Sequence, residues 1–445
     1  MLQCTDCVIV YRLRSLFVVF CLVVISLVVI RLAVSALRNP MEVVHYLIPY
    51  ALDWLNLIVR WLHLITGIAW IGASFYFVWL DNTIRPPAPG SELANKGVSG
   101  ELWAVHGGGF YNPQKYLVAP ATLPPDLHWF KWEAYSTWLS GFALLTIVYY
   151  FNAQAMMLDQ SVADINSWQA VAIGIGSLLL GWTVYDLLCR SKLGQHDGAF
   201  GIVMFALLVA SSWVLNLFLS GRAAYIHVGA MIGTIMVANV LMLIIPGQRK
   251  MVAAMAAGGK PDAIHGQRAK QRSVHNNYFT LPVLFIMISN HYAMTYRHQH
   301  AWAVLAVIMA AGVLIRHFFN LRHKGRTEWK YPIAGVALLL ALAVALAPKA
   351  PRAGAALKDP GAQFAQVQAI VVQRCVSCHA DHPSQPGFAM APAGIMLHTP
   401  ALIRQNAAKI YQQAVQLKAM PIANLTQMTD AERAQLGAWF EAGAK

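Results

Sequence analysis

Eight apolar stretches, each close to the length that crosses a bilayer as a helix, constrain the fold of this chain most strongly. About 20 apolar residues in a helix span the hydrocarbon core, and a helix satisfies its own backbone hydrogen bonds there. With 58% hydrophobic and only 12% charged residues, the composition also fits a polytopic membrane protein. We therefore expect an all-α membrane helix bundle with spans at about 54–79, 135–152, 168–188, 200–219, 225–245, 278–296, 300–320 and 331–347.

The first forty residues allow three interpretations. The apolar run Leu16–Ile30 follows a basic start and would suit an extra helix or an uncleaved signal anchor. The small residues at 33–36 would also suit cleavage by a signal peptidase. Alternatively, translation begins at Met41 and 1–40 is an upstream extension.

The composition changes after the last apolar stretch. The segment 348–360 is rich in Pro, Ala, Gly and alternating charge, which is typical of a linker. The remaining residues, 361–445, resemble a small soluble domain. Ala362–Gln373 suits its first helix, and Thr429 or Asp430 can cap its last one.

This tail carries the C-x-x-C-H motif Cys375-Val376-Ser377-Cys378-His379. Two cysteines at this spacing can both bond the edge of one porphyrin, and the adjacent histidine becomes an axial iron ligand. The pattern predicts a covalently bound haem c in a class I-like cytochrome c domain. Met420, held in a turn by Pro421, is the preferred sixth ligand because a thioether raises the reduction potential. The alternatives are Met390, Met396 and His398.

A haem c is attached on the outer face of a bacterial inner membrane, so the tail is expected to be periplasmic. Eight spans then place 246–277 and 321–330 in the cytoplasm, and both segments are rich in Lys and Arg. The outer segment 153–167 has two aspartates and no basic residue. This agrees with the positive-inside rule. The rule also accounts for the net charge of +14 without a nucleic-acid partner.

Within the transmembrane domain 41–347, the long connection 80–134 is predicted to be cytoplasmic. Its aromatic residues are too dense for a flexible linker, so we expect it to be functional or packed against the bundle. His106, His128 and Glu133 are its candidates for binding or proton transfer. The three glycines at 107–109 lack the phosphate-binding patterns.

Histidines within spans are the next candidates, because ionisable groups at membrane depth are costly and tend to be functional. The predicted topology puts His63, His227 and His291 toward the periplasm and His317 toward the cytoplasm. The first three could meet around a haem b or a substrate. Alternatively, each is hydrogen-bonded to a neighbouring helix or sits at the interface.

The first span has one polar face. Asn56, Arg60, His63 and Gly67 follow each other at helical spacing and therefore share a side of the helix. An amide, a cation, an imidazole and a gap could hold a planar anion, or the edge of a second haem with Arg60 on a propionate. Arg60 and His63 are our candidate catalytic residues.

Two stretches resemble the bacterial integral-membrane urate oxidase (urate hydroxylase) family. One runs from Asp53 to Phe77, and the other is Gly100–Tyr111 continued by Leu127–Ala134. In that family an eight-span portion is fused to a C-terminal cytochrome c, and the resemblance covers about 41–445. It implies oxidation of urate toward 5-hydroxyisourate in purine catabolism. Electrons would leave through haem c to a respiratory cytochrome or terminal oxidase.

The first span also resembles small membrane haem proteins in its pattern W-L-H-x-x-x-G-I-A-W. In those proteins the histidine ligates haem b, which implies a second, non-covalent haem near His63.

Two other classes compete with an enzyme. One is a membrane-anchored cytochrome c subunit that serves a separate dehydrogenase, but an anchor needs one span rather than eight. The other is a transporter with an appended cytochrome. The chain lacks the repeated, Gly- or Pro-broken helix pairs of such folds.

Overall fold

The computed structural model describes residues 48–347, 360–385, 388 and 390–444. The expectations for 1–40, and for nearly all of the linker 348–360, therefore lie outside the described residues. The described chain forms two compact units. The larger unit holds 59–347 and 409–442, and the smaller holds 48–58, 360–408 and 443–444.

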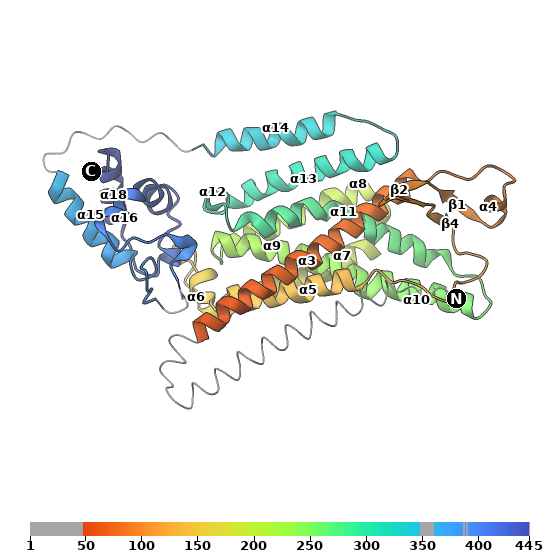
Figure 1. Ribbon diagram of the computed structural model, residues 1–445, viewed down its shortest axis with the longest axis horizontal. Helices are drawn as coiled ribbons and strands as arrows, with labels where there is room; N and C mark the ends of the chain where they lie inside the picture. The colour runs from red at the N-terminus through yellow and green to blue at the C-terminus, as the bar shows by residue number, and fades with distance from the viewer. Residues whose placement is uncertain (1–47, 348–359, 386–387, 389, 445) are drawn as a thin grey trace, which may run out of the picture. The chain divides into compact units, whose positions relative to one another are not determined.

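Helices dominate the larger unit, and each predicted apolar stretch lies largely within one (Figure 1). Five of them are long and apolar enough to cross a membrane, judged by length and composition. The helices that carry the apolar stretches are α3 (Ile48–Thr83), α5 (Trp132–Leu145) with the π-helical η2 (Thr146–Tyr150), α7 (Ser167–Arg190), α8 (Asp197–Asn216), α9 (Gly221–Ala238) with η4 (Asn239–Ile244) and α10 (Ile245–Ala256), α11 (Ala263–Ser289), α13 (Ala301–His323) and α14 (Lys330–Ala345). The shorter helices between them are α4 (Glu92–Asn95), α6 (Ala153–Met156), η3 (Lys192–Gln195) and α12 (Ala293–Tyr296).

The basic segment 246–277 is almost entirely helical. α10 continues the fifth apolar stretch to Ala256, and α11 begins at Ala263, well before the sixth apolar stretch. Asp262 caps α11 by accepting a hydrogen bond from the N–H of Ile264 at 2.9 Å. A helix can continue past its apolar part because its backbone hydrogen bonds do not depend on the side chains. Hydropathy therefore marks the apolar part of these helices and misses their ends.

The connection 80–134 contains the two small sheets of the described chain, which the all-α expectation missed. β1 (Val98–Glu101) pairs with β4 (Gln114–Tyr116), and β2 (Ala104–His106) pairs with β3 (Gly109–Tyr111), both antiparallel. Gly107 and Gly108 have φ values of 60° and 82° and form the turn between β2 and β3. Two residues with positive φ are what a tight hairpin requires. Strands of three or four residues are too short to give a period-2 signal in the sequence.

The core of the larger unit lies among α7, α8, α9 and α11. Its fully buried side chains include Tyr185, Tyr225, Ile232 and Ile286. A Cβ on Gly229 would overlap Ile286, so this glycine permits the close approach of α9 and α11. By contrast, apolar side chains on α3 such as Leu64 and Ile68 are exposed, as expected for a helix facing lipid.

A polar network crosses this core. Arg272 of α11, 3% exposed, donates through one amino group to Asp186 Oδ1 of α7 at 2.7 Å. Its other amino group donates to Asn239 Oδ1 of η4 at 3.2 Å. The Asn239 amide in turn donates to the Tyr185 hydroxyl at 2.9 Å and to Asn276 Oδ1 at 2.8 Å. The Asn239 side chain thereby links α7, η4 and α11. Asn239 is also the first residue of a π-helical turn, a feature often found at functional sites.

The C-terminal segments are helical as well. They are α15 (Pro360–Arg374), η5 (Pro392–Gly394), α16 (Pro400–Gln405), α17 (Ala407–Ile410), η6 (Tyr411–Gln416), η7 (Ile422–Asn424) and α18 (Asp430–Glu441). The predicted first and last helices of the tail are both confirmed. Thr429 caps α18 in a capping box with Glu432.

From the polar network we predict that Asp186 stabilises the folded protein mainly through its buried partner, Arg272, and much less through its exposed partner, Arg190. Asp186→Asn would leave the Arg272 charge buried and uncompensated, and should lower the free energy of unfolding by about 3–5 kcal/mol. Arg190→Gln removes the exposed arginine that lies 2.7 Å from Asp186 Oδ2. It should cost at most about 1 kcal/mol. Thermal unfolding of both variants in detergent compares them, and equal losses would contradict the assignment.

Candidate functional site

The Cys375–His379 motif forms a compact turn directly after α15. The Cys375 N–H bonds the Val371 carbonyl at 2.8 Å, and the N–H groups of Cys378 and His379 bond the Cys375 carbonyl at 3.2 and 2.9 Å. No disulfide joins the two half-buried cysteines. Burial raises the pKa of the Cys378 thiol, which keeps it protonated near neutral pH. The turn thus keeps both cysteines at the end of one helix, neither of them in a disulfide.

The His379 ring is oriented by one hydrogen bond. Its Nδ1 lies 2.8 Å from the Ile395 carbonyl oxygen. Because a carbonyl only accepts, Nδ1 carries a proton, and in the neutral ring the lone pair is on Nε2. The Leu397 N–H donates to the His379 carbonyl at 2.7 Å and holds the backbone in place. This is the arrangement that an iron-ligating histidine needs.

The candidates for the sixth ligand differ in exposure. Met390 is 70% exposed and His398 is exposed, while Met396 and Met420 are half-buried. The Met420 backbone is fixed: its N–H donates to the Gln413 carbonyl at 3.0 Å, and its carbonyl accepts from Arg433 at 2.7 Å. Met420 stays the predicted ligand.

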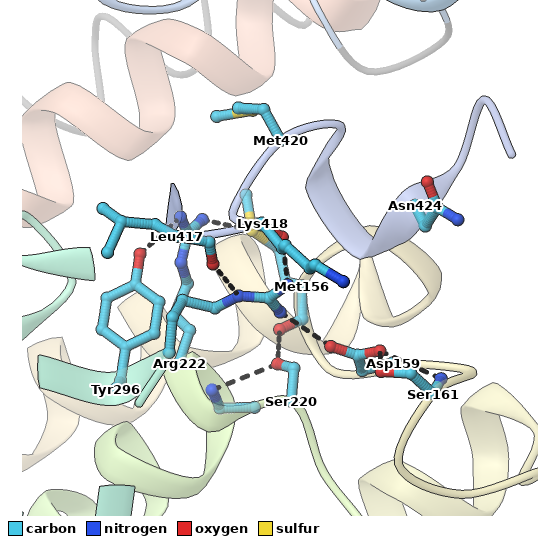
Figure 2. Close-up of polar contacts among 12 residues, drawn as sticks. Met156, Asp159, Ser161, Ser220, Arg222, Tyr296, Leu417, Lys418, Met420 and Asn424 are labelled. Carbon is cyan, nitrogen blue, oxygen red and sulfur yellow. Dashed lines mark hydrogen bonds and ion pairs between the residues drawn. The ribbon is translucent and has the colours of Figure 1, made fainter. Parts of the chain in front are cut away.

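In the larger unit, Arg297 contacts the segment that leads to Met420. Leu417, Lys418 and Met420 of this segment are labelled in Figure 2. The Arg297 guanidinium pairs with Asp159 Oδ2 at 2.7 Å, donates to the Leu417 carbonyl at 3.3 Å, and also donates to the Lys418 carbonyl. The other oxygen of Asp159 accepts from the Ser161 hydroxyl at 2.6 Å. One arginine thus joins the 153–167 connection to the chain just before Met420.

A small cleft lies beside Arg297. Figure 2 shows Met156, Ser220, Arg222 and Tyr296 from its lining. Arg222 donates to the Tyr296 hydroxyl at 3.0 Å, and Ser220 donates to the Met156 carbonyl at 2.9 Å. Two guanidinium groups and one carboxylate leave the cleft with net positive charge, which attracts anions. Sequence reasoning missed Arg222 and Arg297, because each sits at the edge of an apolar stretch, where a basic residue is ordinary. The cleft is lined by Ala155, Met156, Leu158, Asp159, Ser220, Arg222, Tyr296, Arg297, Ala419, Ile422 and Ala423.

His63 lies between α3 and α5. Its Nδ1 is 3.1 Å from the Thr137 carbonyl and 3.2 Å from the Ser140 hydroxyl oxygen, so Nδ1 donates and Nε2 keeps its lone pair. A Cβ on Gly141 would lie 2.8 Å from the imidazole Cε1, so that glycine makes room for the ring. Arg60, one turn earlier, is exposed and interacts electrostatically with His63.

His227 is fully buried in α9. Its Nδ1 donates to the Ala223 carbonyl at 2.8 Å, and the Tyr150 hydroxyl lies 3.3 Å from Nε2. A Cβ on Gly174 would overlap the ring. His291 lies in the exposed turn that follows α11. Within the described ranges, no group of three or more His, Cys, Asp or Glu could hold a metal ion, so the three histidines form no shared cluster there.

The predicted loop residues lie at the surface or in part-buried positions. His106 and His128 are exposed, and Glu133 is half-buried at the start of α5. The His128 ring contacts Phe130, whose ring contacts Phe77 of α3 at 4.8 Å. The end of the connection is therefore packed against the first helix, one of the two expected outcomes. His317 bonds Tyr278, with 2.7 Å between Nδ1 and the hydroxyl oxygen.

The Arg297 contacts predict a local effect on the segment before Met420. Arg297→Ala removes an ion pair and two hydrogen bonds to carbonyls. It should speed hydrogen exchange of the Ala419 and Met420 amides, which bond Gln413, at least ~10-fold. Lys418→Ala is the matched control, because it keeps the carbonyl and loses only an exposed pair with Asp430. Equal rates in the Arg297→Ala variant and the wild type, measured by mass spectrometry, would rule out this role.

A family model described as urate oxidase N-terminal matches residues 49–347. The match runs from α3 through α14 and ends before the segment that carries the C-x-x-C-H motif. No curated protein and no solved structure matches the chain.

Proposed function

Because this chain belongs to the urate oxidase N-terminal family, we propose that it is a membrane-bound oxidoreductase that converts urate to 5-hydroxyisourate. The family match over residues 49–347 is the observation that carries this proposal. The reaction forms a bond between C5 of urate and the oxygen of a water molecule. It releases two protons and two electrons, so the enzyme needs a proton acceptor and an electron acceptor.

The electron acceptor that we propose is a haem c in the C-terminal domain. Cys375 and Cys378 would hold it as thioethers, and His379 and Met420 would be its axial ligands. When bound, it accepts one electron at a time and passes it to a downstream respiratory cytochrome or terminal oxidase. The turn at the end of α15 and the hydrogen bond from His379 Nδ1 to the Ile395 carbonyl support this assignment.

We further propose that eight helices cross the bacterial inner membrane and that the cytochrome domain is periplasmic. Five helices of sufficient length and hydropathy support the membrane location. The Lys and Arg residues of 246–277 and 321–330 support the orientation.

Arg60 and His63 are proposed to lie at or near the centre that reacts with urate or relays its electrons. The support is that the His63 Nε2 lone pair is left available, as a ligand to a haem b or a general base requires. Arg60 and Arg222 both interact electrostatically with Tyr149.

Anaerobic addition of urate to the purified protein should reduce its haem c and raise the reduced absorption band. Replacing Cys375 and Cys378 together by alanine should remove haem staining from a denaturing gel and abolish this reduction. Met420→Ala should keep the stain but lower the potential and remove the methionine–iron absorption band. A wild-type protein whose haem c stays oxidised with urate would refute the proposed function.

Arg60→Ala and His63→Ala should each lower urate turnover by at least ~10²-fold, as expected on losing a positioned catalytic group. The control is Leu64→Ala, because Leu64 lies on the same helix and is 60% exposed. If His63 ligates a haem b, its loss should also remove a haem that acid acetone extracts. Full turnover in His63→Ala, with only covalent haem in the wild type, would exclude both roles.

A further inference from the structure

Two arginines are buried in the long helices of the larger unit, and they differ in their counter-charge. Arg272 is 3% exposed and pairs with Asp186 at 2.7 Å. Arg316 of α13 is 5% exposed. Among the residues that the structure describes, no carboxylate lies within ion-pair distance of Arg316.

The groups that surround Arg316 are neutral. Its Nε donates to Asn277 Oδ1 at 2.6 Å, and the Asn277 amide donates to Asn320 Oδ1 at 2.9 Å, which fixes the orientation of that amide. The guanidinium carbon lies 3.9 Å from the centre of the Phe75 ring. One terminal amino group, Nη2, is buried and has no hydrogen-bond partner within the described ranges.

A buried cation with an unused donor is expensive. Burying a charge costs several kcal/mol unless it is paired and hydrogen-bonded. One amide and one aromatic face compensate part of this cost. They supply no negative charge, and they leave Nη2 unsatisfied. An acceptor that carries negative charge would supply both the counter-charge and the hydrogen bond.

We propose that Arg316 is the anion-binding residue of the substrate site and that its ligand is the urate anion, an inference that rests on the proposed function. Phe75 lies roughly 20 Å along α3 from Arg60 and His63, so with urate at Arg316 those two residues take the second of their proposed roles and relay its electrons. Urate is planar and carries its negative charge over ring nitrogens and carbonyl oxygens. A guanidinium suits such an acceptor because its donors lie in one plane. Phe75 covers one face of the guanidinium, so the anion bonds its edge through Nη2.

The neighbouring side chains suit a reaction that releases protons. Tyr278 interacts electrostatically with Arg316, and its hydroxyl lies 2.7 Å from His317 Nδ1. The Tyr331 ring contacts the imidazole edge-to-face, with 4.5 Å between the two ring centres. A phenol hydrogen-bonded to an imidazole, next to a bound anion, provides a route for protons away from it.

The two arginines of the cleft, Arg297 and Arg222, differ from Arg316 in having partners within the protein for their charge or their donors. Arg297 has a carboxylate and two carbonyls as partners, and Arg222 bonds the Tyr296 hydroxyl. Their charges are already compensated or hydrogen-bonded within the protein. Arg316 alone among these three combines near-complete burial with an unused donor.

The test is urate binding to the full-length holoprotein under anaerobic conditions, measured by equilibrium dialysis. Arg316→Gln should weaken binding about 10- to 100-fold, the range for losing a hydrogen bond to a charged group. Binding of hypoxanthine, a neutral purine, should change much less. Arg322→Gln, on an exposed residue of the same helix, is the matched control and should bind urate as the wild type does.

A second variant separates binding from folding. Asn277→Asp keeps the shape of the side chain and gives Arg316 an internal carboxylate at the position that now accepts from Nε. The second carboxylate oxygen replaces the amide that donates to Asn320 Oδ1, so the Asn320 amide must turn and donate to it. It should raise the unfolding temperature without urate and weaken urate binding at least ~10-fold, because the charge is then neutralised. Weaker binding with an unchanged or higher unfolding temperature in this variant supports the proposal even if Arg316→Gln fails to fold.

Wild-type affinity in Arg316→Gln or in Asn277→Asp would overturn the assignment of the anion site. In that case reduction of haem c by urate in the wild type would still uphold the proposed function. If the wild type neither binds urate nor transfers its electrons, the proposed function fails and the site assignment fails with it.

Discussion

The ion pair between Arg272 and Asp186, extended by Asn239, fixes how the helices of the larger unit fit together. Apolar helix surfaces pack in several registers at similar energy, whereas a buried charge has few positions in which its partners satisfy it. The network joins α7, η4 and α11 at one level of the bundle. It therefore also sets the position of Asn277, one residue after Asn276, where it meets Arg316 of α13.

The two arginines buried in the long helices, Arg272 and Arg316, illustrate one rule applied in two ways. Arg272 is neutralised inside the protein and contributes to its stability. Arg316 is placed with neutral neighbours, so part of its interaction energy is kept for a ligand. Natural proteins often accept such a local cost at a functional site. By the same reasoning, Arg297 differs from a ligand-binding arginine. Its guanidinium already uses its donors within the protein, where it joins two parts of one unit.

The sequence predicted the helices well because hydropathy and capping are local properties. The apolar stretches, the helix before Cys375 and the Thr429 cap are all read from neighbouring residues. What it could not predict is which polar side chains meet. Arg272 resembled any other basic residue of a cytoplasmic segment, and its partner Asp186 is 86 residues away. Likewise, the free lone pair on Nε2 of His63 follows from a hydrogen bond between Nδ1 and a carbonyl of another helix. The strands of the β2–β3 hairpin are too short to give a period-2 signal in the sequence.

The place of Arg316 along its helix has an energetic consequence. It lies fifteen residues after Ala301, which is roughly 22 Å at about 1.5 Å per residue. Arg297, just before that helix, touches the segment that leads to Met420. On the proposed topology, electrons taken from urate near the cytoplasm move outward while the protons stay behind. A membrane potential that is negative inside then favours the outward movement of each electron, by about 2.3 kcal/mol per 100 mV. Turnover is thereby coupled to the voltage across the membrane: the voltage of an energised cell favours urate oxidation, and each electron transferred lowers that voltage.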